Sequence, residues 1–292
     1  MAKNNEKSLY IITLLIIILS TVTSAVGLLY KTSGKAFNFV NQYGNTVKMY
    51  GNGLYARDSL FKAATARGTD FTILCVAIPM LIIALILDAK KKTLKNRLFL
   101  TGIISVFMYY SASIAFGITY NILDLVYIAL FSSSLFGLIV SITSIHMKDI
   151  LIVKSLPYKG IYIFLALSGA ALIAAWLPDI ITSLIAKSSL SLIEVYTTEI
   201  TYVLDIGILA PLMFICLFQL KNRNGLGYVL LESLLMLCMI VGMMIPIQTV
   251  FELSAGIKLS IGEIVTKGLS FIILALFALY FNIKLFENIK KG

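Results

Sequence analysis

The sequence predicts an all-α membrane protein, a polytopic bundle of about eight transmembrane helices, and three observations predict it. Of the 292 residues, 59% are hydrophobic and only 13% are charged, whereas soluble domains are about 45–50% apolar and about 25% charged. The apolar residues gather in runs of about 20, the length that crosses a bilayer. Lys and Arg gather in connections that would share one side of the membrane. A lipid bilayer is therefore the expected solvent.

The apolar runs are joined by short connections, with one longer exception between the first and second runs. We expect a single membrane domain over residues 1–292 and no soluble domain. The predicted spans are 9–30, 71–87, 98–119, 122–145, 161–177, 200–220, 226–248 and 264–285.

Residues 1–30 allow two interpretations. Lys3 and Lys7 precede an apolar run that ends in small residues at Ala25, which fits a cleaved signal peptide. Uncharged residues continue to Tyr30, which is long enough to span. We favour an uncleaved anchor helix; the alternative leaves seven spans.

Positive charge predicts the orientation. The segment AKKKTLKNR, residues 89–97, carries five Lys or Arg residues, and the other short connections on its side add more. Such connections stay in the cytoplasm, so we expect a plasma-membrane protein with both termini cytoplasmic. The net charge of +10 then predicts contact with anionic lipid headgroups and no nucleic-acid partner.

The longer connection, residues 31–69, is predicted to be a structured extracellular cap. Its segment RDSLFKAATARG has an Asp start, an Ala-rich middle and a Gly stop, so we expect a short helix near residues 58–66 that packs over the outer mouth. The Gly-x-Gly at 51–53 follows no strand of an α/β pattern and predicts no nucleotide site. The cap residues that we single out are Tyr55, Arg57, Asp58, Arg67 and Asp70.

Polar residues inside the predicted spans suggest a site. Ionisable groups in a span are costly and usually face the bundle interior or a water-filled cavity. Asp124 and Tyr127 share one helical face, as do Tyr202 and Asp205. An outward-facing polar cavity is one interpretation; interhelical hydrogen bonds and interface tyrosines are the other. The candidate ligand-binding residues are Tyr120, Asn121, Asp124, Tyr127, Tyr202, Asp205 and Lys267, with Lys267 expected to pair with Asp205 or Asp124.

Four of the five prolines lie in or at the ends of predicted spans. Each removes a backbone hydrogen bond and can kink a helix. We expect the fifth span to end near Pro178, followed by a kinked continuation or an amphipathic surface helix. The four prolines are Pro79, Pro178, Pro211 and Pro246.

The residues for familiar catalysis are sparse. The only histidine, His146, is predicted on the cytoplasmic side, and the three cysteines lie inside apolar runs. We therefore expect no zinc site, no other metal and no cofactor, and no Ser/His/Asp set on the outer face. A hydrolase built on carboxylates stays conceivable, so the sequence leaves enzymatic activity undecided.

Three blocks carry a resemblance: YGNGLYARDSLFKAATARGTDF, SASIAFGITYNILDLVYIALFSSSLFGL and TYVLDIGILAPLMF. In this order they resemble a family of bacterial multi-pass membrane proteins of unassigned function, over residues 50 to about 285. The resemblance implies one shared external site, since its blocks hold Tyr55, Asp58, Gly68, Asp70, Tyr120, Asn121 and Asp205.

Three functional classes follow. The first is a transporter or a protein that binds a small molecule or lipid in an outward-facing cavity. The second is a sensor or an accessory subunit that docks a membrane partner protein. The third is a membrane enzyme acting on lipid or envelope precursors.

Overall fold

The computed structural model describes residues 2–147, 150, 156–190 and 192–289, with the side chains of residues 2–5 and 267 left out. Eight helical segments are long and apolar enough to cross a membrane, which confirms the predicted all-α bundle. The first half contains α1 (Ala2–Leu29), β1 (Phe37–Val40), β2 (Thr46–Met49), α2 (Leu60–Thr72), the π-helical turn η1 (Ile73–Ala77), α3 (Ile78–Lys90), α4 (Leu94–Gly117) and α5 (Asp124–Thr143). The second half contains α6 (Tyr158–Ala186), α7 (Ile200–Leu204), the π-helical turn η3 (Asp205–Leu209), α8 (Ala210–Lys221), α9 (Gly225–Ser254) and α10 (Ile261–Asn288).

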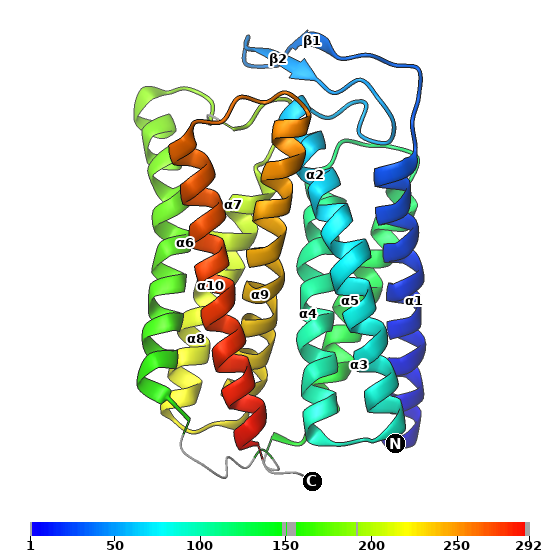
Figure 1. Ribbon diagram of the computed structural model, residues 1–292, viewed down its shortest axis with the longest axis vertical. Coiled ribbons are helices and arrows are strands. Elements are labelled where there is room, and N and C mark those ends of the chain that lie inside the picture. The colour runs from blue at the N-terminus through cyan, green and yellow to red at the C-terminus, as the bar shows by residue number, and fades with distance from the viewer. Residues whose placement is uncertain (1, 148–149, 151–155, 191, 290–292) are drawn as a thin grey trace.

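The helices stand side by side in two groups that meet at α9 (Figure 1). Helix α9 packs against α2, α4, α8 and α10, and its most apolar stretch is 72% buried, against 12% in α10. The start of α1 and the end of α10 lie at one end of the bundle and the β-hairpin lies at the other (Figure 1). We call these the terminal end and the hairpin end.

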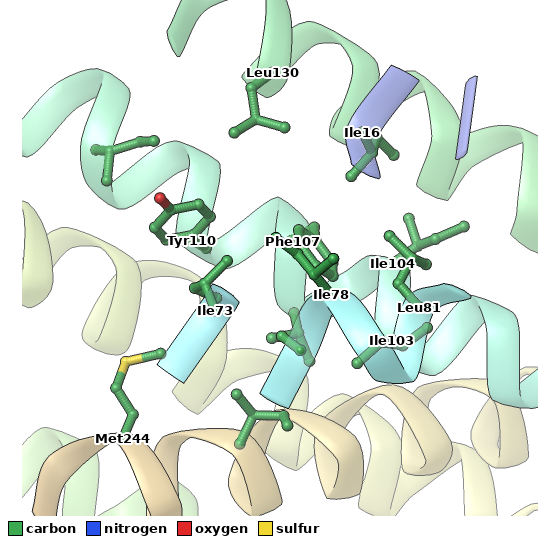
Figure 2. Close-up of a cluster of buried hydrophobic side chains, with 14 of the residues drawn as sticks. Ile16, Ile73, Ile78, Leu81, Ile103, Ile104, Phe107, Tyr110, Leu130 and Met244 are labelled. Carbon is green, nitrogen blue, oxygen red and sulfur yellow. The ribbon is translucent and has the colours of Figure 1, made fainter. Parts of the chain in front are cut away.

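Two apolar cores fill the groups. In the first core, Ile73 and Leu81 belong to one cluster with Phe107 and Tyr110 of α4 (Figure 2). The second core joins α6, α8, α9 and α10. Helix α9 contributes to both, with Ile240 in the first and Leu235 in the second, so it ties the groups together.

Two of the prolines are accommodated by π-helical turns. The N–H of Ile78 bonds to the carbonyl of Ile73 just before Pro79, and the N–H of Ala210 bonds to the carbonyl of Asp205 just before Pro211. A proline ring clashes with the carbonyl four residues back, and the wider turn with a five-residue step makes room for it. Both helices therefore cross the membrane region without a break.

Helix α6 is longer than the predicted fifth span. Pro178 lies inside the helix, which continues to Ala186 and ends at Lys187 with a φ of 51°. A proline is tolerated there because neighbouring groups in a helical bundle can satisfy the freed carbonyl.

The region expected to be a cap has two parts. Strands β1 and β2 form an antiparallel hairpin in which Phe37 pairs with Met49. Helix α2 then starts after Ser59, whose Oγ accepts the N–H of Lys62 at 3.0 Å, and it continues through η1 and α3 to Lys90. Helix α2 is therefore the start of the second span, and the separate helix expected near residues 58–66 does not form.

Gly68 explains why this helix does not stop at its glycine. A Cβ at Gly68 would lie 2.6 Å from the Cα of Gln248 in α9. Small residues at helix interfaces allow such close backbone approach in membranes. Gly68 therefore packs α2 against α9 and does not end the helix.

Candidate ligand-binding site

A polar cavity of about 240 Å³ opens at the hairpin end, between the end of α1, the loop that precedes α2, and α2 itself. Its lining contains two cations, Lys31 and Arg67, and no acid. Tyrosine hydroxyls and the Asn52 amide supply the other polar side chains. The lining residues are Gly27, Leu28, Tyr30, Lys31, Tyr50, Asn52, Leu54, Tyr55 and Arg67.

Arg67 is held in this cavity by neutral partners. Its Nη1 donates to the hydroxyl of Tyr50 at 3.1 Å, and its Nη2 donates to the carbonyl of Leu28 at 3.4 Å. The guanidinium also lies 5.7 Å from the ring centre of Phe251. None of the ion pairs found in the described part of the chain includes Arg67.

Below the cavity lies a buried carboxyl. The Tyr55 hydroxyl donates to Oδ2 of Asp70 at 2.6 Å, and the Tyr110 hydroxyl donates to Oδ1 at 3.1 Å. Burial, then the Asp70 charge, raises the pKa of Tyr55 well above its ordinary value, so this hydroxyl keeps its proton. Asp70 is fully buried. Its carboxyl lies directly against Gly27 of α1, since a Cβ on Gly27 would lie 1.9 Å from Oδ2 of Asp70.

Asp205 forms a second buried cluster. The hydroxyl of Tyr109 donates to its Oδ1 at 2.9 Å, and the indole N–H of Trp176 donates to its Oδ2 at 2.8 Å. Trp176 stacks on Tyr202 with ring centres 4.9 Å apart, and the Tyr202 hydroxyl donates to Asp179 at 2.8 Å. Both oxygens of Asp205 are therefore occupied by donors from α4 and α6.

Asp58 joins the two helix groups at the hairpin end. Its Oδ1 accepts the backbone N–H of Thr119 and the hydroxyl of Tyr196, both at 2.9 Å. Burial raises the pKa of Asp58 from 3.8 to about 6. The Ser59 hydroxyl donates to Glu194, whose pKa burial also raises. These contacts fix the loop before α7 onto the start of α2.

A nearby ion pair and a second cavity complete this junction. Nζ of Lys62 lies 3.3 Å from Oε1 of Glu199, so the loop before α7 is also tied to α2 by charge. A cavity of about 390 Å³ lies between the hairpin, the start of α2 and the same loop, and its lining mixes apolar side chains with the polar side chains of Asn41, Asn45, Thr46, Lys48 and Glu194.

The remaining predicted site residues lie apart from the cavities. Asn121 donates to the Tyr127 hydroxyl at 3.3 Å, and Asp124 begins α5. Tyr120 is 72% exposed, and Arg57 is exposed. Lys267 lies in α10, but its side chain is outside the described residues, so its pairing stays a prediction.

Sequence reasoning singled out two lining residues, Tyr55 and Arg67, and the acid beneath them, but as residues of an extracellular cap; among the described side chains, none of the seven predicted ligand-binding residues lines this cavity. It missed Gly27 and Tyr110, which complete the Asp70 cluster, and Trp176 beside Asp205. Trp176 is the only tryptophan of the chain, and that rarity was the one signal available. The described residues contain no group of three or more His, Cys, Asp or Glu side chains able to hold a metal.

No protein-family model, curated protein or solved structure matches this chain. The resemblance to a bacterial family therefore stays a prediction. The eight apolar helices indicate a multi-pass integral membrane protein, and the chemistry of its cavities is the guide to its function.

Proposed function

We infer that this integral membrane protein binds a small anionic molecule or an anionic lipid headgroup at the outer face of the membrane, as a transporter or solute-binding protein does. The observation that carries this proposal is a cavity lined by Lys31 and Arg67 and by no acid. Asp70 beneath the cavity interacts electrostatically with Arg67, and a ligand with a phosphate or carboxylate group would bring a negative charge to the lining itself.

Arg67 is suited to grip such a group. A guanidinium has five N–H donors. Two hydrogen bonds from Arg67 go to Tyr50 and Leu28, which leaves donors for a ligand. The planar fork binds phosphate and carboxylate through two parallel hydrogen bonds. Because Tyr50, Leu28 and Phe251 already fix the guanidinium, little side-chain freedom is lost when the ligand binds.

The size of the cavity limits the ligand. Pockets for drug-sized molecules span about 300–1,000 Å³, and this cavity encloses about 240 Å³. It suits a headgroup or a small acid. Since the basic segment 89–97 lies at the terminal end, the positive-inside rule assigns the hairpin end to the outside, and the ligand would enter from there.

Transport and sensing both begin with binding, so binding is the step to test. Purified full-length protein is titrated with sodium phosphate at constant ionic strength by calorimetry. In parallel, it is incorporated into nanodiscs with and without phosphatidylglycerol, and native mass spectrometry counts retained lipid. Phosphate binding alone indicates a free anion, and lipid retention alone indicates a headgroup.

The decisive variant is Arg67→Gln, with exposed Arg57→Gln as its matched control. Losing a charged hydrogen-bond donor costs about 1.5–3 kcal/mol, so Arg67→Gln should weaken binding of the active probe at least about tenfold. Arg57→Gln should change it less than about twofold. The proposal fails if neither probe binds the wild type, or if the two variants bind equally well.

A further inference from the structure

Glu232 is a buried acid at the opposite end of the bundle from the cavity. It is the eighth residue of α9, about 10 Å along the helix from its start. Its side chain is completely buried. One carboxyl oxygen, Oε2, accepts the side-chain N–H of Asn282 in α10 at 2.6 Å. The other, Oε1, has no hydrogen-bond partner among the described residues.

This carboxyl differs from three other acids within the spans. Asp70 and Asp205 each accept a donor on both oxygens. Asp88 is paired with Arg97, whose Nη2 lies 2.9 Å from its Oδ2. Glu232 has one neutral amide donor and an oxygen left over. Its surroundings therefore offer much less support for a negative charge.

No neighbouring helix brings a free cation to Glu232 in the described part of the chain. In α4, Arg97 is held by Asp88, and Lys95 donates to the carbonyl of Phe286 in α10. In α10, Lys284 pairs with Glu287 at the surface. In α8, Lys221 is exposed at the helix end. The nearby polar side chain Ser105 already donates to the carbonyl of Gly102 at 2.6 Å.

Gly102 encloses the unpartnered oxygen. A Cβ at this position of α4 would lie 2.9 Å from Oε1 and 3.0 Å from Cγ of Glu232. The glycine thus lets the α4 backbone pack directly on the carboxyl. An ionised carboxylate is very costly in such an apolar site without a cation, so the neutral acid is the form that fits.

We propose that Glu232 is an intramembrane proton-binding site, which holds, between α4, α9 and α10, a proton that exchanges with solvent. Intramembrane acids of this kind form proton relays in pumps and transporters. A metal cation would need about six oxygen ligands, and Asn282 turns its N–H toward the carboxyl. The inference stands independently of the anion cavity, which lies at the hairpin end.

Infrared spectroscopy of the full-length protein in lipid tests this. At neutral pH, the wild-type spectrum minus that of Glu232→Gln should show the carbonyl stretch of a protonated carboxylic acid. In deuterated water, that band should shift to lower frequency, because the proton exchanges with solvent. Glu263→Gln is the matched control, since Glu263 is exposed at the start of α10, and it should leave the band intact.

Two outcomes would overturn the proposal: carboxylate bands in place of the protonated band at neutral pH, or a protonated band that does not shift in deuterated water. The latter would make Glu232 a static structural acid. If Glu232→Gln does not fold, Asn282→Leu serves instead. It removes the one donor to Oε2, so the band should move to higher frequency, and an unmoved band would also contradict the assignment.

Discussion

Asp70 and Asp205 occupy similar places in the two helix groups, and their enclosure differs. Each lies on the helix that carries a π-helical turn just before a proline. Each accepts a hydrogen bond from the hydroxyl of one of two adjacent tyrosines of α4: Tyr110 for Asp70 and Tyr109 for Asp205. Asp70 is fully buried, whereas Asp205 keeps 6% of its surface exposed. The same kind of polar contact is thus built into a closed site in one group and a more open site in the other.

The surroundings explain this difference. Asp70 is pressed against the backbone of α1 at Gly27, inside the first core. The second donor to Asp205, Trp176, comes from α6, whose most apolar stretch is only 22% buried. We therefore expect the first group to resist change and the second to tolerate it.

Removing the two acids should give the largest contrast. Asp70→Ala leaves the buried hydroxyls of Tyr55 and Tyr110 without their acceptor, at about 1–3 kcal/mol each, so the free energy of unfolding should fall by about 4 kcal/mol. Asp205→Ala should cost about 2 kcal/mol, because one of the two donors to Asp205, Trp176, is only half-buried. Unfolding in detergent with increasing sodium dodecyl sulfate measures both. Equal losses would contradict the difference in enclosure.

The contact between the groups should depend on pH through Asp58. Burial raises its folded pKa from 3.8 to about 6, so its stabilisation is fully present below about pH 4 and is lost as pH rises through about 6. The full effect is about 3 kcal/mol, and Glu194 acts in the same direction. Lys62, which lowers the pKa of both acids, limits the effect.

Melting temperatures of the detergent-solubilised protein between pH 4 and pH 8 test the role of Asp58. The wild type should melt lower as pH rises, and Asp58→Asn, which keeps an acceptor for Tyr196, should flatten the curve. An unchanged slope in the variant would assign the pH dependence to other groups.

A pair of glycine substitutions probes the backbone contacts. In Gly27→Ala the new Cβ would lie 1.9 Å from Oδ2 of Asp70, and overpacking of this kind costs about 1–3 kcal/mol. Gly207→Ala meets open space and removes a flexible residue from a helix, so it should be neutral or stabilise by up to about 1 kcal/mol. Unfolding free energies from detergent titration measure both variants, and a destabilised Gly207→Ala would show that the space around Gly207 is not open.

The sequence predicts the helices and the charged residues of the site, but not the partners of those residues. Apolar runs predict helices because every backbone polar group must be satisfied inside lipid. Pro178 misleads about a helix end because helical bundles tolerate it. Arg67 and Asp70 stand out because charges beside apolar runs are rare. The tyrosine partners of the acids do not stand out in the sequence. Tyr109 and Tyr110 point toward different helix groups, and the direction of each side chain depends on how α4 packs against distant segments.

The smallest expected effects come from these adjacent tyrosines. Tyr110→Phe removes a bond to Asp70 and a contact with Ser24 at 3.3 Å, so it should cost about 1.5 kcal/mol. Tyr109→Phe removes one bond, to Asp205, and should cost about 1 kcal/mol. The unfolding free energies of the two single variants and of the double variant, measured by detergent titration, form a double-mutant cycle.

That cycle measures whether α4 couples the two groups. If the acids act independently, the double variant should lose the sum of the two single losses within about 0.5 kcal/mol. A larger discrepancy would mean that a change at Asp70 is felt at Asp205 through the shared helix. The Asp70 site beneath the cavity and the Asp205 site beside Trp176 would then form one unit, and the ligand proposed at Arg67 would alter the second group.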